Sequence, residues 1–387
     1  MEGLFLASST NSIGANLAEA RSSTTLWTNI AKTVIFILAG FIFTKKKWLP
    51  DNTGKTLTKF VRKVCLPCLA FCSFRSAFTV QGGIDAAVNF VLGFVFYIGF
   101  IFLSKLIFIW VKDKDKRLVL SVLFAFGSTT FFGYPLVVAI YGNAAGNDFN
   151  LRNVAYRVFL YSYAYRAIAG INKENGGKDA SFAAICKKVF LNPIIIATFA
   201  GLLLWVLQAI PGSAMVRTDW LKPNTSLAAD KIQYVAFWRF DVTLPWIFQA
   251  AKTLGSLAST IILFAIGCTL GGTNIADAVK DKYAWAWTGL KVIVAPLVVL
   301  GILFAVEAIA KACGFPKLIS ADTLHSSVIT WMVPPATVAV GYCINYDKEK
   351  EMASHLSLVG TLGSVIGIVI WVIVLTVIDA TGFFYVA

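Results

Sequence analysis

The sequence is poor in charge and in the side chains that most enzymes use for catalysis. Only 14% of its 387 residues are charged and only two are histidine, whereas 58% are hydrophobic and the mean hydropathy is +0.74. A chain with so little polar surface does not suit a water-soluble fold, and apolar stretches of this kind span membranes. The composition therefore indicates a polytopic integral membrane protein.

Several patterns that would indicate other functions are missing from the sequence. No phosphate-binding P-loop occurs, which argues against direct use of ATP. No predicted span has clustered carboxylates, paired histidines or a nucleophile beside a base, so we expect no enzyme and no cofactor. Cys65, Cys68 and Cys72 share one face of a predicted helix without histidine partners, so we expect small buried side chains and no metal site.

Apolar runs close to the roughly 20 residues needed to cross a bilayer recur along the whole chain. An odd number of spans in each half inverts the second repeat relative to the first. The expected fold is an all-α polytopic membrane protein with ten transmembrane helices in two inverted five-helix repeats. The predicted spans are residues 26–43, 55–78, 83–111, 117–142, 151–171, 189–210, 243–272, 284–310, 318–346 and 352–378.

Polar segments divide these spans into regions. We expect an external N-terminal extension at residues 1–25, the first repeat at 26–171, a cytoplasmic linker at 172–188 and the second repeat at 189–387. An external loop at 211–242 contains aromatic residues among mixed charges. Aromatic side chains settle at membrane interfaces, so we expect this loop to be partly helical and to lie there.

Positive charge distinguishes the two sides of the membrane, because Lys and Arg accumulate in cytoplasmic loops. Alternate loops, starting after the first span, contain nineteen of them, within residues 45–63, 112–117, 173–188, 280–282 and 348–350. The other side contains nine, namely Arg21, Arg152, Arg157, Arg217, Lys222, Lys231, Arg239, Lys311 and Lys317. Both termini are therefore expected outside, with the cell membrane as the expected location. The net charge of +14 then reflects orientation and not nucleic-acid binding.

Two apolar stretches about 200 residues apart place helix-breaking residues in mid-span. They are STTFFGYPL at residues 128–136 and TWMVPPATV at residues 330–338. Proline removes a backbone hydrogen bond and lipid supplies no substitute, so broken backbone at that depth lies in protein or lines a wet cavity. Matching breaks in the two halves indicate a midplane substrate site. Prolines that only kink packed helices are the alternative.

Proline suits the first turn of a helix, so we expect Pro135 and Pro335 to begin the second half-helices. The N-terminus of each half-helix would then point at the bilayer centre. Its unpaired N–H groups and partial positive charge favour a carboxylate there. The expected crossover and substrate-binding residues are Ser128, Thr129, Thr130, Gly133, Pro135, Thr330, Pro334, Pro335 and Thr337.

Ionisable side chains inside spans are costly and usually face the protein interior. Arg75 and Lys291 are the candidates for compensating an anionic substrate or for coupling transport to an ion. Snorkelling to the interface is the alternative for Arg75. His325 lies near the outer end of a span, where we expect a solvated histidine in preference to a proton carrier.

Small residues recur at the GxxxG spacing, at residues 267–271 and 363–367. This spacing allows the backbones of two membrane helices to approach closely. We therefore expect close helix packing at both places.

Five regions with distinctive motifs follow one another along the chain. They are KVCLPCLAF at 63–71, STTFFGYPLVVAIYG at 128–142, VFLNPIIIATFAGLLL at 189–204, GCTLGG at 267–272 with GLKVIVAPLV at 289–298, and MVPPATVAVGYCINYDKEKEMAS at 332–354. In this order they resemble the auxin efflux carrier family. The resemblance implies a ten-helix secondary carrier, similar to bacterial organic anion and malate permeases, whose fourth and ninth helices cross at their breaks. The family usually has Asn at the position of Ser128, so this chain departs there.

These observations predict a secondary active transporter, a permease or efflux carrier that moves a small organic anion by alternating access. A carboxylate is the expected substrate. An anion channel, or a carrier for a non-carboxylate solute, is the alternative. The expected partners are the substrate anion, membrane lipid, and protons or another coupling ion. A homodimer is compatible with the sequence, and no nucleic-acid partner is expected.

Overall fold

The computed structural model describes residues 24–72, 74, 77–169, 190–210, 214–221, 233–272, 275–315, 317–379 and 381–385. Most of the predicted N-terminal extension, the whole predicted linker at 172–188, and Arg75 lie outside the described residues. The divisions at these two segments therefore stay predictions.

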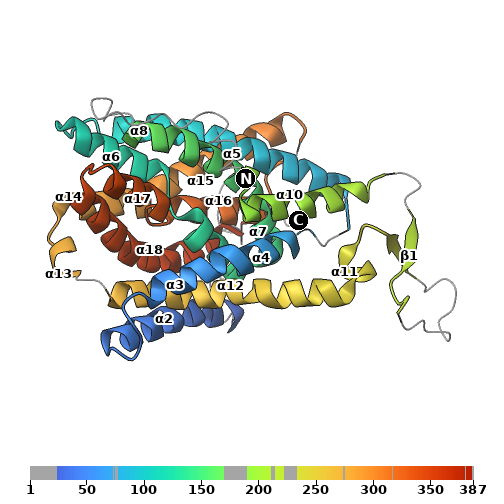
Figure 1. The fold of residues 1–387 in the computed structure, drawn as a ribbon. Helices are drawn as coiled ribbons and strands as arrows, with labels where there is room; N and C mark the ends of the chain where they lie inside the picture. Colours follow the sequence, from blue (N-terminus) through green and yellow to red (C-terminus); the bar gives the residue numbers. More distant parts are fainter. Residues whose placement is uncertain are drawn as a thin grey trace.

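Helices make up most of the described chain (Figure 1). The first half contains α2 (Thr24–Lys45), α3 (Thr53–Phe60), α4 (Leu66–Cys72), α5 (Val80–Ile107), α6 (Lys114–Ala125), α7 (Tyr134–Phe159) and α8 (Tyr165–Ala169). The second half contains α10 (Pro193–Leu207), α11 (Phe240–Thr243), α12 (Pro245–Gly271), α13 (Ile275–Ala278), α14 (Lys282–Gly289), α15 (Ala295–Ala312), α16 (Ala321–Met332), α17 (Thr337–Asn345) and α18 (Lys350–Asp379). Four π-helical turns join consecutive helices, namely η1 (Val61–Cys65), η2 (Thr129–Gly133), η3 (Leu160–Ala164) and η6 (Leu290–Val294).

The lengths and compositions of these helices confirm a polytopic membrane protein. Among the described residues, four helical segments are long and apolar enough to cross a bilayer, namely α5, α12, α14 to α15, and α18. Shorter apolar helices occupy residues 35–45, 129–142 and 193–207. Helix α7 contains a kink at Gly142, whose φ of 87° lies outside helical geometry, so its two parts belong to different rods.

Three of the four π-helical turns end two residues before a proline. These prolines are Pro67, Pro135 and Pro296. Proline cannot donate to the carbonyl four residues earlier, and its ring pushes that carbonyl aside, so the turn widens. For Pro296 the carbonyl concerned is that of Val292, and it accepts a hydrogen bond of 2.7 Å from the indole N–H of Trp371 instead. Helix α18 thus satisfies the backbone group that the proline leaves unpaired.

The helices pack into two sets. We call α2, α3, α4, α10 and α12 the panel set, because α2 and α4 pack along α12 and α10 packs on α4. We call α5 to α8 and α14 to α18 the crossover set, in which α5 packs on α7, α14 on α18 and α15 on α16. The blue and yellow helices α2, α3, α4 and α12 run side by side in Figure 1, next to the crossover set.

Glycine allows the closest helix contacts, as the GxxxG spacing predicted. A Cβ atom at Gly267 would lie 2.0 Å from the carbonyl oxygen of Ile37, so α12 and α2 touch through their backbones there. A Cβ atom at Gly363 would lie 2.2 Å from Cγ2 of Thr288. The expectation of close packing is therefore confirmed at both places.

The loop at residues 211–242, predicted to be external, contains an element that the all-α prediction missed. Strands β1 (Met215–Arg217) and β2 (Tyr234–Ala236) form a two-stranded antiparallel sheet, followed by the short helix α11. Met215 pairs with Ala236 and Arg217 with Tyr234. The loop is thus partly strand as well as partly helical, because strands this short leave no periodic pattern to detect.

Two of the nine charges assigned to the outer side are buried within a helix. Arg152 and Arg157 belong to α7 and are only 3% and 2% exposed. The predicted span began at Leu151, so these residues were counted as flanking charges when they are buried ones. A buried guanidinium inside a membrane protein needs polar partners, which are described below.

We predict that Gly267→Ala destabilises the protein, because the new methyl group would force α2 and α12 apart. Overpacking of this kind costs about 1–3 kcal/mol. Gly301→Ala is the matched control, since a Cβ atom there meets nothing within 4 Å and removing a helical glycine is neutral or favourable. Thermal denaturation in detergent should show a lower melting temperature for the first variant only. Equal melting temperatures would contradict the close contact.

Candidate functional site

Two helices are interrupted at the same place in the fold, and their breaks pair with each other. Helix α6 ends at Ala125 and helical geometry resumes at Thr129, while α16 ends at Met332 and resumes at Thr337. Gly127 and Pro335 form an isolated antiparallel β-bridge between the breaks. We call the paired segments 126–128 and 333–336 the crossover.

Backbone hydrogen bonds join the two sides of the crossover. The amide of Ser128 donates to the carbonyl of Pro334 at 2.6 Å, and the amide of Ala336 donates to the carbonyl of Phe126 at 2.9 Å. Each break thus supplies hydrogen-bond partners for backbone groups of the other break. Broken backbone inside a membrane needs such partners, because lipid offers none.

Close approach at the crossover depends on a glycine. A Cβ atom at Gly127 would lie 2.5 Å from Cγ2 of Val333, so any larger residue would push the breaks apart. Pro335 lies within the second break, just before the N-cap residue Ala336. Pro135 does not begin its half-helix, because the helical turns start at Thr129 and the proline follows the π-helical turn η2. Pro135 lies in the first turn of α7, but the half-helix as a whole begins six residues before it, at the widened turn. Pro335 does not begin its half-helix either, because α17 starts at Thr337.

The C-terminal ends of the broken helices are covered by hydrogen-bond donors. The ammonium group of Lys291 donates to the carbonyl of Phe124 at 2.7 Å, and the hydroxyl of Ser364 donates to the carbonyl of Met332 at 2.7 Å. The negative ends of two helix dipoles are therefore neutralised. The N-terminal ends at Thr129 and Thr337 carry the positive ends of helix dipoles, which favour negative charge nearby.

A cavity of about 110 Å³ lies against the crossover, between the panel set and the crossover set. That volume equals about four water molecules. Hydroxyl groups supply its polar side chains, and none of its described lining residues is ionisable. It is lined by Thr58, Ser128, Phe131, Phe132, Ile262, Ile266, Thr269, Leu270, Pro334, Pro335, Thr337, Ser357, Leu358 and Thr361. We call it the crossover cavity.

The hydroxyl groups of the crossover cavity differ in availability. Thr58 and Thr361 donate to carbonyls of their own helices at 2.7 Å and 2.6 Å. The side chains of Ser128, Thr337 and Ser357 form no hydrogen bond with any other described residue. These three hydroxyls can therefore donate to a solute in the cavity.

Four of the nine predicted crossover residues line the cavity, namely Ser128, Pro334, Pro335 and Thr337. Five do not. Thr129 and Thr130 bond to Asn153 instead. The hydroxyl of Thr330 donates to the carbonyl of Ser326 at 2.6 Å. The remaining two are Gly133, which packs against Phe149 and Val333, and Pro135 in α7.

Lys291 is fully buried behind the crossover and does not line the cavity. Its ammonium lies 5.0 Å from the ring centroids of both Phe124 and Trp331. Cation–π contacts and one carbonyl thus hold a cation without a carboxylate partner among the described residues. The structure does not describe Arg75, so its role stays a prediction.

Sequence analysis missed the polar face of α7 beneath the crossover. The amide of Asn153 accepts from the hydroxyl of Thr129 at 2.6 Å and donates to the hydroxyl of Thr130 at 3.2 Å. Arg157, one turn further along, donates to the carbonyl of Asn153 at 3.4 Å. The signal was present, because polar residues four apart on one helix share a face. It was overlooked because Arg157 was counted with the charges of the outer loops.

A second cavity, of about 360 Å³, lies on the opposite side of the crossover. Thr58 lines the first cavity and Phe74 the second. Helix α16 also lies between the two cavities, because Ser320 before its start lines the second and Pro334 beyond its end lines the first, and its 12 residues extend about 18 Å. The carboxylates of Asp85, Asp148 and Asp322 line the second cavity, which we call the outer cavity.

A buried network separates the two cavities. The guanidinium of Arg152 donates to Asn89 on α5 and to Ser326 on α16. These partners lie one helical turn further along than Asp85 and Asp322, which line the outer cavity. The network therefore lies at a depth between the outer cavity and the crossover and ties three helices together.

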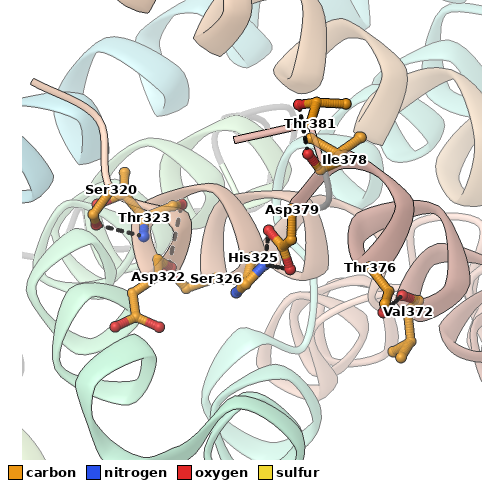
Figure 2. Close-up of polar contacts among 10 residues, drawn as sticks. All are labelled: Ser320, Asp322, Thr323, His325, Ser326, Val372, Thr376, Ile378, Asp379 and Thr381. Atoms are coloured by element: carbon orange, nitrogen blue, oxygen red, sulfur yellow. Dashed lines mark hydrogen bonds and ion pairs between the residues drawn. The ribbon is translucent and has the colours of Figure 1, made fainter. Parts of the chain in front are cut away.

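His325 is buried, contrary to the solvated histidine expected from its position. It is 7% exposed, its Nε2 lies 2.8 Å from each carboxylate oxygen of Asp379, and its ring stacks on Tyr141 at 4.2 Å. Figure 2 shows this pair linking α16 to the end of α18, with Asp322 turned away from it. The C-terminal end of α18 packs against α16. The sequence pattern of neither helix indicates this contact.

Comparison with known proteins gives two matches. The model of a family described as membrane transport protein matches residues 25–372. An uncharacterized transporter from Methanothermobacter thermautotrophicus is 21% identical over 355 residues, which cover 89% of this chain and 97% of the relative. Both matches extend across the two breaks and all the helices between them.

We predict that Asn153→Leu destabilises the protein by about 1–3 kcal/mol, because it leaves the buried hydroxyls of Thr129 and Thr130 without partners. Thr330→Val is the control, since its hydroxyl only bonds its own helix. Thermal denaturation in detergent measures both. In a double-mutant cycle with Thr129→Val, the combined loss should be smaller than the sum of the single losses. Strict additivity would contradict a direct Asn153–Thr129 interaction.

Proposed function

Because this chain belongs to the membrane transport protein family, the family of the auxin efflux carriers, we propose that it is a secondary active transporter. It moves a small organic anion, a carboxylate, across a membrane by alternating access. The observation that carries the proposal is the paired crossover, with two helix N-termini and three available hydroxyls beside one cavity.

The proposed topology is two inverted repeats of five helices each. The antiparallel bridge between Gly127 and Pro335 supports it, because a broken helix and its inverted counterpart run in opposite directions where they cross. The ten proposed rods are α2, α3 with α4, α5, α6 with the first part of α7, the second part of α7 with α8, α10, α12, α14 with α15, α16 with α17, and α18.

The electrostatics of the crossover support an anionic substrate. Two positive helix ends face a cavity without acidic lining residues, and the hydroxyls of Ser128, Thr337 and Ser357 can donate to carboxylate oxygens. Lys291 and Arg157 add buried positive charge behind these groups. Lys291 compensates the charge of the bound anion without touching it.

The size of the cavity supports a compact substrate. About 110 Å³ accommodates a carboxylate of a few carbon atoms. Ser128 provides a hydroxyl where the related carriers usually have an amide, and this hydroxyl is shorter and offers a single donor.

Two cavities separated by a closed network favour a carrier over an anion channel. A channel needs one continuous path, whereas the Arg152 network and the crossover interrupt the path here. Both cavities have walls from the panel set and the crossover set. Movement of one set against the other would close the crossover cavity and open the outer one, with transport driven by the membrane potential or a proton gradient.

The proposed orientation places both termini outside the cell membrane. The crossover cavity lies near the helix ends that adjoin the lysine-rich loops at residues 45–63 and 348–350. The structure then corresponds to a state in which the substrate site faces the cytoplasm.

We predict saturable uptake of a small mono- or dicarboxylate into proteoliposomes that contain the purified protein. Ser128→Ala and Thr337→Val should each raise the KM about tenfold or more, because each removes a hydrogen bond to a charged group. Thr376→Val, which alters a hydroxyl bonded within α18, is the matched control with unchanged KM. Non-saturating flux would favour a channel. An unchanged KM in both cavity variants would show that the substrate does not bind at this site.

We also predict different effects from the prolines of the two halves. Pro334→Ala/Pro335→Ala should reduce transport at equal expression, because it removes both prolines from the break and allows α16 and α17 to continue through it. Pro135→Ala should preserve transport, because that proline lies beyond the start of its half-helix. Initial uptake rates measure both. Equal losses would contradict the placement of the break at residues 126–128.

A further inference from the structure

A groove of about 630 Å³ lies away from both cavities, between α5 and the segment η3 to α8. It is open to the surroundings. Its walls are mostly apolar, with Ile98, Phe102 and Phe159 among them, and Lys105 and Arg166 lie at one end. No acidic residue is among its described lining residues.

The groove adjoins a surface that faces lipid. Large apolar side chains on α5 are exposed at intervals of three and four residues, which places them on one face of the helix. They are Val91, Val95, Ile98, Phe102 and Leu106, with exposures of 58%, 54%, 45%, 62% and 64%. In a membrane protein such a face contacts acyl chains, so the groove is open to the bilayer.

The two cations lie at the depth of the lipid headgroups. Lys105 is in the last turn of α5 and Arg166 is in α8, near its end. Residues 112–117, with four positive charges, lie shortly after the end of α5 and include the first turn of α6. Lys105 contacts the rings of Phe102 and Tyr163 at 5.7 Å and 5.5 Å, and neither cation forms an ion pair with a described residue.

The helix wall of the groove has an unusual geometry. The π-helical turn η3 lines it through Ser162 and Tyr163. The other π-helical turns end two residues before a proline, but here that position is Arg166, so no proline forces the widened turn. Such turns occur frequently at functional sites. Here the turn supports the segment that holds Arg166 opposite Lys105.

We propose that this groove binds an anionic phospholipid of the cytoplasmic leaflet. The headgroup phosphate lies between Lys105 and Arg166, and an acyl chain lies along Ile98 and Phe102. Seven residues separate Ile98 from Lys105, so the apolar wall extends about 10 Å below the cations. The charges complement the phosphate, and the apolar wall requires the tail, so a lipid fits better than a free phosphate.

An occupant of the groove lies one side chain away from the crossover. The ring of Tyr163 lies 6.2 Å from the ring of Phe126, whose carbonyl accepts one of the two crossover hydrogen bonds. Lipid binding at the groove is nevertheless independent of the proposed substrate, and it is measured without transport.

Native mass spectrometry of the full-length protein in detergent tests the proposal. The probes are phosphatidylglycerol, phosphatidylcholine of the same chain length, and soluble glycerol phosphate. Lys105→Gln/Arg166→Gln should bind phosphatidylglycerol about 30-fold more weakly than the wild type, since each charge near an anionic headgroup contributes about a factor of five. Lys55→Gln/Lys112→Gln removes two exposed positive charges outside the groove and should bind it as the wild type does.

Controls separate the alternatives. Lys105 and Arg166 are exposed, so their replacement should not disturb folding. Lys105→Arg/Arg166→Lys keeps both charges and should retain phosphatidylglycerol binding. Equal phosphatidylglycerol affinity in the two glutamine variants would overturn the site. Equal binding of phosphatidylcholine and phosphatidylglycerol would overturn the role of the cations. Tight binding of glycerol phosphate would show a free-phosphate site instead of a lipid site.

Discussion

The requirement that every backbone group inside a membrane has a partner determines the centre of this fold. Two helices lose that pairing at residues 126–128 and 333–336, and each recovers it from the other through two backbone hydrogen bonds. Because the breaks satisfy one another, neither can be displaced alone without exposing unpaired groups. Gly127 permits the approach, and the helices that pack around the crossover hold it in place.

The negative and positive ends of the broken helices have different surroundings at the crossover. Lys291 and Ser364 bond to carbonyls at the ends of α6 and α16, so the negative ends are neutralised from behind. The positive ends remain next to a cavity whose polar lining consists of hydroxyls. The proposed anion-binding site is thus formed by backbone geometry and hydroxyls, without a charged side chain in contact with the ligand. Such a site can release its ligand more readily than a direct ion pair would, which suits a carrier.

The sequence predicted the membrane class, the family and both breaks, because hydrophobic length and mid-span prolines are local signals. It could not predict which side chains face the cavity. Thr129 and Thr130 turn to Asn153, whereas Ser128 and Thr337 face the cavity, and these choices depend on helices distant in sequence. Pro135 was misplaced because a π-helical turn absorbs it. His325 was taken for a surface residue because its partner Asp379 lies 54 residues later. Arg152 and Arg157 were taken for loop charges because the burial of a cation depends on partners that a hydropathy pattern does not contain.

The central claim is that a small carboxylate binds between the two helix N-termini at the crossover. A density map of the purified protein saturated with malonate tests it most directly. We expect density for the dicarboxylate in the crossover cavity, with its carboxylate oxygens within hydrogen-bond distance of the Ser128 and Thr337 hydroxyls. Malonate bound at the carboxylate-lined outer cavity, or continuous helices through residues 126–128 and 333–336, would contradict it.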